Sequence, residues 1–305
     1  MKIILIGQAA FAQQVLDGLV ARKHEIAAVY CPIDSAGARI DPVKARALEL
    51  GMPVRQHKSL RGPAIQAEVA AFDADLAVLA FVTQIVPPGV FELPRFGSIC
   101  FHPSLLPRYR GGSAVNWQII RGERATGVSV FWVDAGIDTG PILLQRRATI
   151  SPDDTAATLY YDTLFPLGVD AVIQAVELIE QGQAPRMHQD ESMASYDPLC
   201  RDEHARIDWT RPIAEIYDLV RGCDPQPGAY TPFRGRKLRL YGCKRVGGGT
   251  NRPGLVESIA DGSLVVGGTD GALTVGKVRL EEGKISVGEF VERERVVAGQ
   301  TVLGI

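Results

Sequence analysis

One histidine and one aspartate in the middle of the chain could exchange protons with a bound substrate. His102 follows the apolar run 98–101, and Asp138 lies in a glycine-rich turn after a second apolar run, 128–133. An imidazole beside a carboxylate is a frequent arrangement for general acid–base catalysis, because the carboxylate holds the ring and can accept a proton. The side chains can meet only if the two runs form strands that lie near each other. The alternative is a structural histidine and an ordinary turn aspartate.

The residues after His102 must form a shaped loop. Pro103 and Pro107 lack backbone donors, and the pair Gly111-Gly112 allows backbone angles that other residues avoid. His102 is therefore expected at the end of a buried strand. This is where α/β enzymes place residues that bind ligands and carry out chemistry.

The amino-acid sequence of this region resembles that of a known family. It runs His102-Pro-Ser-Leu-Leu-Pro-Arg-Tyr-Arg-Gly-Gly, continues with Asn116-Trp117 and closes with Asp134-Ala-Gly-Ile-Asp-Thr-Gly140. This long composite motif, together with the spacing between His102 and Asp138, is similar to the signature of the folate-dependent formyltransferase family. Motifs along nearly the whole chain are most similar to the amino-terminal hydrolase domain of the 10-formyltetrahydrofolate dehydrogenases. The methionyl-tRNA formyltransferases are similar as well.

The resemblance implies a set of site residues. His102 and Asp138 would be catalytic, with the imidazolium stabilising an oxyanion and protonating the folate nitrogen. The folate would be bound by Phe81, Val82, Thr83, Gln84, Ile85, Val86, Cys100, Ser104, Arg110, Asp134, Ala135, Gly136 and Ile137. Among these, Ser104 and Arg110 are expected, with Thr139, to orient the loop. The resemblance implies 10-formyltetrahydrofolate as the formyl donor and no metal.

The stretch 81–88 has two interpretations. It is apolar and ends in Pro87-Pro88, so it fits a helix start with Thr83 as the cap. In the family, this loop lines the slot for the flat pterin ring, which needs an apolar surface with a few fixed polar groups. Both interpretations can hold together.

Cys100 departs from the transferases of the family, which usually carry asparagine there. A thiol is a poor hydrogen-bond donor, whereas a carboxamide can help to fix the formyl group during transfer to an amine. Hydrolysis to tetrahydrofolate and formate is therefore the preferred prediction. Transfer to an amine, either methionyl-tRNA or an amino-sugar nucleotide, stays open, as does a folate-binding module without catalytic activity.

The order of predicted elements indicates an α/β fold. Strands are predicted at Lys2–Gly7, Glu25–Cys31, Asp75–Phe81 and Pro141–Ile150, and helices at Ala9–Ala21, Asp41–Leu50, Pro63–Phe72 and from Pro152 to about Glu180. This alternation predicts a Rossmann-like, mostly parallel sheet, which the resemblance identifies as the formyltransferase fold. The turn Gly7-Gln-Ala-Ala-Phe-Ala lacks the later glycines of the dinucleotide fingerprint, so no nicotinamide cofactor is expected.

The pattern changes to short strands and glycine-rich turns in the last hundred residues. After a helix at Pro212–Arg221, strands are predicted at Lys237–Cys243, Gly254–Ile259, Ser263–Val266 and Ala272–Val278. They predict a small open β-barrel, and the resemblance implies an oligonucleotide-fold-like domain. We expect a catalytic domain over 1–188, a linker over 189–203 and a carboxy-terminal barrel domain over 204–305.

Charge and composition favour a small-molecule substrate over nucleic acid or a membrane. The 305 residues are 46% hydrophobic with a net charge of −2, and the part from Arg201 to Ile305 has 16 Lys+Arg against 14 Asp+Glu. A surface that follows phosphates would need a clustered basic excess. The one basic concentration, 234–245, fits a solvated strand face equally well.

The cysteines and the apolar segments indicate a cytoplasmic protein. The five cysteines are scattered without metal-ligand spacing, so we expect free thiols in a reducing compartment and neither a metal site nor a disulfide. No apolar stretch is long enough to span a membrane, and the first residues do not form a signal peptide. The sequence does not indicate an oligomeric state.

Overall fold

The computed structural model describes residues 1–249, 251–280 and 283–304. The chain forms two compact units whose segments interleave in sequence. The first unit contains Met1–Gly111, Gly127–Ala148 and Asp162–Tyr196, and the second contains Gly112–Thr126, Thr149–Tyr161 and Asp197–Ile305. The domain boundaries expected from the sequence, after residue 188 and before residue 204, stay a prediction.

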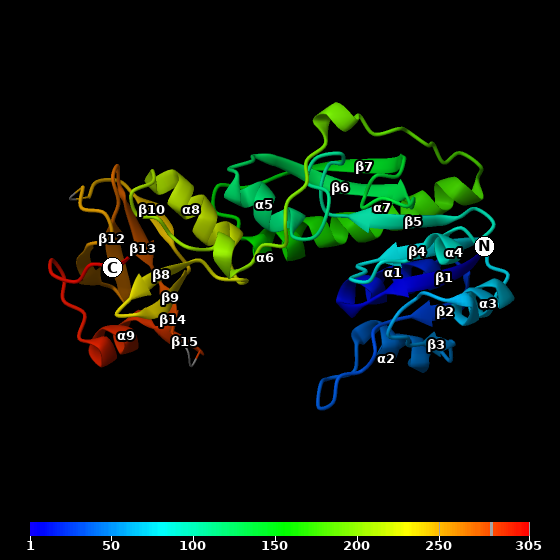
Figure 1. Ribbon diagram of the computed structural model, residues 1–305, viewed down its shortest axis with the longest axis horizontal. Helices are drawn as coiled ribbons and strands as arrows, with labels where there is room; N and C mark the ends of the chain where they lie inside the picture. The colour runs from blue at the N-terminus through cyan, green and yellow to red at the C-terminus, as the bar shows by residue number, and fades with distance from the viewer. Residues whose placement is uncertain (250, 281–282, 305) are drawn as a thin grey trace. The chain divides into compact units, whose positions relative to one another are not determined.

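The first unit is built around one sheet (Figure 1). Within the described residues, seven strands follow the order β3-β2-β1-β4-β5-β6-β7. Their bounds are β1 (Lys2–Gly7), β2 (Glu25–Tyr30), β3 (Val54–Arg55), β4 (Leu76–Ala80), β5 (Ser98–His102), β6 (Ala125–Trp132) and β7 (Ile142–Thr149). β1 pairs in parallel with β2 and β4, and β4 with β5, whereas β6 runs antiparallel to β5. The predicted Rossmann-like, mostly parallel sheet is confirmed.

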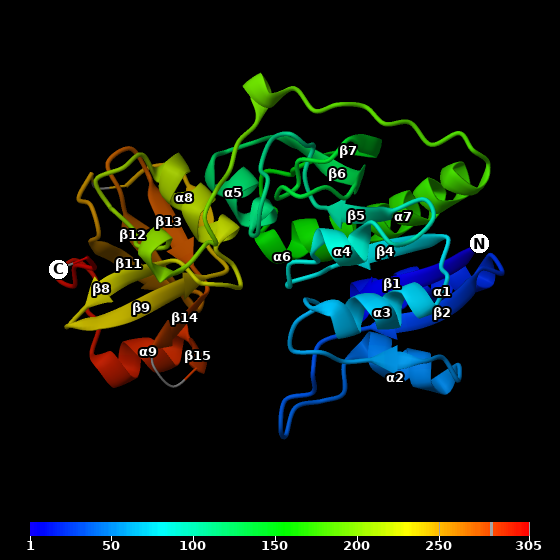
Figure 2. The ribbon, with the colours of Figure 1, turned by 45° about the vertical axis from the view of Figure 1, so that its right-hand side comes forward.

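Helices cover both faces of this sheet (Figures 1 and 2). Their bounds are α1 (Ala9–Ala21), α2 (Pro42–Glu49), α3 (Pro63–Ala71), α4 (Pro88–Phe91) and α7 (Phe165–Glu180). On one face, Phe11 of α1 stacks on Phe101 of β5 with the ring centroids 4.3 Å apart. On the other face, Ile4 and Ile6 of β1 share a core with Val90 of α4. Burial on both faces explains why the central strands are apolar at successive positions.

The turn between β1 and α1 is occupied by a carboxylate of the protein itself. The backbone N–H of Ala9 lies 3.0 Å from both carboxylate oxygens of Asp41, which also accepts from Val43 N at 3.0 Å and so caps α2. Dinucleotide-binding folds place a phosphate at this helix end, because its free N–H groups and dipole attract negative charge. A carboxylate in that place repels a phosphate. Gly7 is needed here because a Cβ would lie 2.2 Å from the carbonyl oxygen of Ala80.

Two expected helix starts differ in the structure. The helix predicted from Pro152 to Glu180 is divided into α6 (Ala156–Thr158), a π-helical turn (Leu159–Leu164) and α7. Pro166 has no backbone N–H to donate to the preceding turn, which explains the break. Thr83 does not cap α4, which starts at Pro88 after Pro87, because prolines disfavour helical geometry in the residue before them.

The second unit contains two antiparallel sheets. Within the described residues their strand orders are β10-β13-β12-β11 and β15-β14-β9-β8. The strands are β8 (Tyr230–Phe233), β9 (Arg236–Tyr241), β10 (Lys244–Val246), β11 (Val256–Ala260), β12 (Ser263–Gly267), β13 (Ala272–Val275), β14 (Lys277–Leu280) and β15 (Gly283–Ser286). The single strand predicted over Ala272–Val278 is therefore two strands, and the chain changes sheet at Gly276. A Cβ at Gly276 would lie 3.2 Å from the carbonyl oxygen of Gly242, so a side chain fits poorly at this corner.

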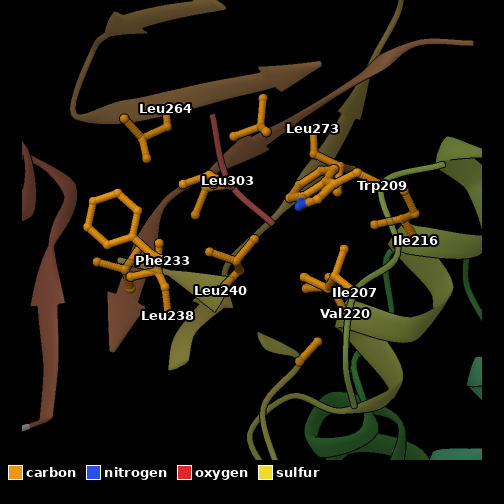
Figure 3. Packing of buried hydrophobic residues seen from close by; sticks show 14 of the residues in the cluster. Ile207, Trp209, Ile216, Val220, Phe233, Leu238, Leu240, Leu264, Leu273 and Leu303 are labelled. Atoms are coloured by element: carbon orange, nitrogen blue, oxygen red, sulfur yellow. The ribbon is translucent and has the colours of Figure 1, made fainter. Parts of the chain in front are cut away.

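A continuous apolar core holds the second unit together. Figure 3 shows its centre, where Trp209, Leu240 and Leu303 lie among residues of both sheets. Within the described residues, its helices are α5 (Ala114–Ile120), the short α6, α8 (Ile213–Gly222) and α9 (Val287–Glu294), with short 3₁₀ turns at Asp202–His204 here and Glu191–Met193 in the first unit. α5 packs against α8, and the Asn116 side chain donates to the carbonyl oxygen of Gly222 at 2.7 Å.

Three features of the described residues bear on function. All five cysteines are free thiols. No group of three or more His, Cys, Asp or Glu side chains is placed to hold a metal ion in the part of the chain that the structure describes. Over the same residues, no helix combines the length and the apolar character needed to cross a membrane.

Candidate active site

The structure brings His102 and Asp138 together at the end of β5. Nδ1 of His102 lies 3.5 Å from Oδ2 of Asp138, and the imidazole is only 5% exposed. The other ring nitrogen, Nε2, lies 2.7 Å from the carbonyl oxygen of Tyr109. A carbonyl can only accept, so Nε2 carries a hydrogen and donates it. Nδ1, on the side of Asp138, is therefore the atom that can take or give a proton.

The backbone around this pair adopts uncommon angles. Tyr109 has φ +61° and Asp138 has φ +56°, both in the left-handed region. Aspartate tolerates this region because its short side chain forms local hydrogen bonds, whereas a tyrosine there is strained. Such strain persists only where surrounding contacts hold it, and it gathers at functional sites. Here the N–H of Tyr109 donates to Oγ of Ser195 at 2.8 Å.

Two hydrogen bonds to Asp138 and one to Gly140 hold the turn that carries Asp138. Its Oδ2 accepts from the backbone N–H of Gly111 at 2.7 Å. The carboxamide of Gln189 donates from Nε2 to the carbonyl oxygens of Asp138, at 2.9 Å, and Gly140, at 2.7 Å. Oε1 of the same carboxamide accepts from Arg110 at 2.8 and 3.1 Å. Gln189 thus connects the loop after β5 with the loop after β6.

Arg110 and Ser104 are occupied by protein contacts. The Arg110 guanidinium is buried and donates to Gln189, to both carboxylate oxygens of Glu191 and to the hydroxyl of Tyr196. The hydrogen bonds to Glu191 raise the pKa of Arg110. The Ser104 hydroxyl is also buried and donates to the carbonyl oxygen of Arg108 at 2.7 Å. Both side chains hold the loop through protein contacts, and their part in binding folate stays a prediction.

Cys100 lies beside the pair on β5. It packs against Phe131, Ile142 and Leu106 on one side and adjoins the core that contains Val86. Burial, together with the nearby Asp138 carboxylate, raises the pKa of the Cys100 thiol. Because only the thiolate is a good nucleophile, Cys100 is a neutral neighbour of the site and not an attacking group.

The loop from Asp134 to Gly140 is a tight turn that presents its tip to solvent. Oδ1 of Asp134 accepts from the N–H of Gly136 at 3.1 Å and from the hydroxyl of Thr139 at 2.6 Å. A Cβ at Gly140 would lie 1.7 Å from the carbonyl oxygen of Trp132, so the turn requires glycine there. Ile137 at the tip is 60% exposed and offers a bare apolar surface.

The stretch Phe81–Gln84 lines a pocket at the carboxyl ends of β1 to β4. The pocket also contains Gly7 and Gln8, Tyr30 to Pro32, Arg55, His57 and Leu60. β1 and β4 are the neighbouring strands at which the strand order reverses, and ligands of open α/β sheets bind in the crevice at this point. Of the predicted folate-binding residues, only Phe81, Val82, Thr83 and Gln84 line this pocket. Ile85 is exposed and Val86 is buried.

The structure brings the predicted pair His102 and Asp138 together, and their catalytic role stays a prediction. The sequence does not reveal the groups that hold the pair, namely Gln189, which lies in the predicted linker, and the carbonyl oxygen of Tyr109. Gln189 lies in a polar stretch whose composition is that of a linker, and no local pattern separates a connecting glutamine from a solvated one. The sequence offers one signal for Tyr109, which is its place in a loop between Pro107 and Gly111. Such a loop adopts unusual backbone angles, and Tyr109 has one of them.

Comparison with known proteins places this geometry in a family. Residues 1–176 match the formyl transferase family, and residues 200–294 match the formyl transferase C-terminal domain. The chain is 38% identical to cytosolic 10-formyltetrahydrofolate dehydrogenase of Homo sapiens, over 98% of this chain and 36% of that protein. It therefore spans about a third of the length of that relative. It is 36% identical to methionyl-tRNA formyltransferase of Syntrophus aciditrophicus (strain SB), over 100% of this chain and 99% of that protein.

Solved structures share the fold. HypX from Aquifex aeolicus in complex with tetrahydrofolic acid has a TM-score of 0.72 and 21% identity, over 98% of this chain and 48% of that chain. WlaRD, a sugar 3N-formyl transferase, has a TM-score of 0.69 and 18% identity, over 93% of this chain and 98% of that chain. The family matches cover most of the sequence and include both His102 and Asp138. The chain belongs to the formyl transferase family.

Proposed function

We propose that this protein acts on 10-formyltetrahydrofolate and that water is the preferred acceptor of the formyl group. The observation that carries the proposal is the contact between His102 Nδ1 and the Asp138 carboxylate, with Nε2 committed to the Tyr109 carbonyl. This arrangement supplies one proton-exchanging nitrogen and one proton acceptor beside each other. Both are needed to break an amide-like C–N bond with water.

In the proposed reaction, a water oxygen attacks the formyl carbon and passes one proton to Asp138. The tetrahedral oxyanion is stabilised by the protonated His102. The bond between carbon and N10 of the folate then breaks, and N10 takes a proton from His102. Formate and tetrahydrofolate leave, and the proton on Asp138 returns to His102. The sum is one water added across one C–N bond.

We propose that the pterin ring enters between the stretch 81–86 and the turn 134–137. The exposed side chains of Ile85 and Ile137 support this, because they offer apolar surface on two loops that border the pair. The preference for water rests on Cys100. Its neutral thiol is a poor donor, so it gives little help in fixing a formyl group for an incoming amine.

Transfer to an amine is the second candidate. Its support is the full-length match to a methionyl-tRNA formyltransferase, whereas the match to the dehydrogenase covers only part of that protein. The pocket at the ends of β1 to β4 adds a concave surface that an acceptor could use. A folate-binding module without turnover is the alternative outside enzymes.

The free cysteines fit a reducing compartment, so we propose that the protein works in the cytoplasm.

The decisive experiment measures tetrahydrofolate and formate in the same reaction. The protein is incubated with 10-formyltetrahydrofolate alone, and then with methionyl-tRNA or with an amino-sugar nucleotide. Hydrolysis predicts equal amounts of tetrahydrofolate and formate without any amine. Tetrahydrofolate that forms only with an amine, without formate, would replace hydrolysis by transfer. Folate binding without either product would support the third alternative, a folate-binding module without turnover.

A further inference from the structure

Two of the free cysteines lie in contact within the second unit. The sulfur atoms of Cys200 and Cys223 are 4.0 Å apart. Cys223 is fully buried in the core, and Cys200 is partly exposed at its edge. The pair plays no part in the proposed reaction, since both residues belong to the second unit and His102 and Asp138 belong to the first.

Backbone contacts place both thiols. The N–H of Cys200 donates to Oγ of Ser113 at 3.1 Å, and the preceding Pro198 accepts from the indole of Trp117 at 2.7 Å, so this segment is fastened to α5. Cys223 ends α8, where its N–H donates to the carbonyl oxygen of Leu219 at 3.0 Å. Because α5 packs against α8, the two thiols are held as neighbours although 22 residues separate them in sequence.

The two thiols differ in reactivity. The hydrogen bond between the two thiols lowers the pKa of Cys200. The same contact and burial raise the pKa of Cys223. The thiolate is the form that peroxides oxidise, and solvent reaches Cys200 more readily than Cys223. Cys200 has the properties of the thiol that reacts first, and Cys223 those of the thiol that resolves it.

We propose that Cys200 is a site of reversible oxidation by hydrogen peroxide and that Cys223 resolves it as an intramolecular disulfide. The Cys200 sulfur attacks one peroxide oxygen, the O–O bond breaks, and the cysteine becomes a sulfenic acid while one water leaves. The Cys223 sulfur then attacks the Cys200 sulfur, the S–O bond breaks, and a second water leaves. Two thiols are oxidised to one disulfide, and one peroxide is reduced to two waters.

The contact distance allows this bond after a small movement. A disulfide needs about 2.05 Å between its sulfurs, so the two atoms must approach by about 2 Å. Cys223 is fixed at a helix end, whereas Cys200 lies in an irregular segment, so the segment before Cys200 is expected to move. Its contact with the Trp117 indole would change, which gives a local fluorescence signal.

The test uses the full, reduced chain and a small molar excess of hydrogen peroxide. Free thiols are counted after unfolding, and cross-linked peptides are identified by mass spectrometry. We expect the count to fall from five to three, with a peptide joining Cys200 to Cys223, and dithiothreitol to restore all five. Loss of Cys31, Cys100 or Cys243 while the pair stays reduced would overturn the proposal, and so would disulfides between chains.

Three variants separate the two roles. Cys223→Ser should stop at a sulfenic acid on Cys200, which dimedone traps, and Cys200→Ser should leave Cys223 reduced. Cys243→Ser is the matched control, because this half-buried thiol is not in the pair, and the variant should still lose two thiols on treatment. If a serine destabilises the core, the wild-type peptide map alone decides. A dimedone adduct on Cys223 in the Cys200→Ser protein would contradict the assigned order.

Discussion

At the scale of single residues, the proposed chemistry depends on which nitrogen of His102 is available to a substrate. The Tyr109 carbonyl occupies Nε2, so the ring cannot present that atom to a substrate without losing a buried hydrogen bond. A loop carbonyl seven residues away therefore selects the working atom. Asparagine or glutamine in place of His102 would keep the size of the side chain but could not carry the transferred proton.

The first prediction concerns His102 and Asp138. Alanine at His102 or asparagine at Asp138 should each lower the turnover number by about a hundredfold or more, since proton transfer is removed. The folate KM should change little, whereas alanine at His102 should also lower the melting temperature, because it removes the hydrogen bond to the Tyr109 carbonyl. Steady-state assays of tetrahydrofolate release measure both constants, and His188→Ala, at an exposed histidine, serves as the control. A variant that keeps most of its activity would remove that residue from the mechanism.

At this scale the sequence was informative because the reacting groups belong to long, recognisable motifs. Each motif sets the place of its residue on a strand end, and strand pairing then brings the ends together. Gln189 could not be found in this way. Its importance comes from contacts with Asp138 and Arg110, which lie 51 and 79 positions away, and such contacts exist only after folding.

At the scale of elements, the segment 189–196 fastens the catalytic loops. Gln189 bonds the turn that carries Asp138, while Glu191 and Tyr196 hold the guanidinium of Arg110. The sequence predicts a linker over 189–203, and these bounds stay a prediction. In the structure, residues 189–196 supply the polar partners that a buried arginine requires, since an unpaired charge in the interior costs several kcal/mol.

The second prediction tests this positioning role. Gln189→Ala should lower kcat roughly ten- to hundredfold, because Asp138 loses two of the contacts that fix its loop and small misplacements are costly in catalysis. The folate KM should change less. Gln183→Ala, at an exposed glutamine nearby, should behave as wild type. If the variant is less stable but its folded fraction turns over at the wild-type rate, Gln189 has only a structural role.

The third prediction concerns the contact between α7 and β5. Gly168 faces the Phe101 ring, and an added Cβ would lie 2.3 Å from it. Gly168→Ala should therefore lower the free energy of unfolding by about 1–3 kcal/mol through overpacking. It should also reduce activity, because Phe101 precedes His102. Urea denaturation measures the first effect, and assays at a temperature where the variant is folded measure the second.

A matched glycine should show a change in the free energy of unfolding of the opposite sign. A Cβ added at Gly288 in α9 would meet no neighbouring atom within 4 Å, so Gly288→Ala should raise the free energy of unfolding by up to ~1 kcal/mol through helix propensity. Equal effects at both glycines would show that propensity alone decides, and the overpacking argument would then fail.

The elements that the sequence predicted well have strong periodicity. The bounds of β1 and α1 agree with the expected residues, and the apolar strands β4 and β5 were recognised from their composition. Pattern reasoning failed where one residue changes the backbone path within a continuous pattern, as at Pro166 and Gly276. It also missed α5, whose seven residues between glycines are too short for a helical period to be read.

At the scale of the whole molecule, most of the basic residues in the stretch 234–245 of the second unit are paired with carboxylates. Two carboxylates pair with four of the six basic side chains in the stretch 234–245: Arg234 and Arg236 with Glu294, and Lys237 and Arg239 with Asp202. Arg245 lies over the ring of Tyr217. The stretch 234–245, where basic residues are most concentrated in the sequence, therefore offers little positive charge to a polyanion.

The fourth prediction follows from this pairing. Transfer RNA should bind weakly at 150 mM salt, because binding to phosphates depends on unpaired cations that release counterions. Filter binding over a salt series measures the affinity and its slope. Tight binding at that salt concentration, with a steep slope, would contradict the prediction and would favour methionyl-tRNA as acceptor.

The fifth prediction concerns stability in acid. The hydrogen bonds from Arg239 and Lys237 lower the pKa of Asp202 to about 2. A lowered carboxyl pKa stabilises the folded state above the ordinary pKa, and this contribution is lost as the pH falls through the folded value. Asp202→Asn should therefore lower the melting temperature at neutral pH, and the difference from wild type should shrink between about pH 4 and pH 2.

The effect should be small, since Asp202 is partly exposed and surface pairs contribute at most ~1 kcal/mol. Asp261→Asn is the control, at an exposed aspartate in a turn. A difference that stays constant down to pH 2 would mean that the charge of Asp202 does not stabilise the fold.

The interleaving of the two units limits how this protein can be cut or recombined. α5 and α8 pack against each other although about a hundred residues lie between them, and the segment 149–161 belongs to the same unit. A chimera that exchanges only the residues after 200 would pair a foreign α8 with the resident α5, and it would separate Asn116 from the carbonyl that it binds. A graft that keeps the core of the second unit must carry three pieces of chain. The second unit therefore cannot be exchanged as one continuous piece of chain, because segments of the first unit lie between its three pieces in the sequence.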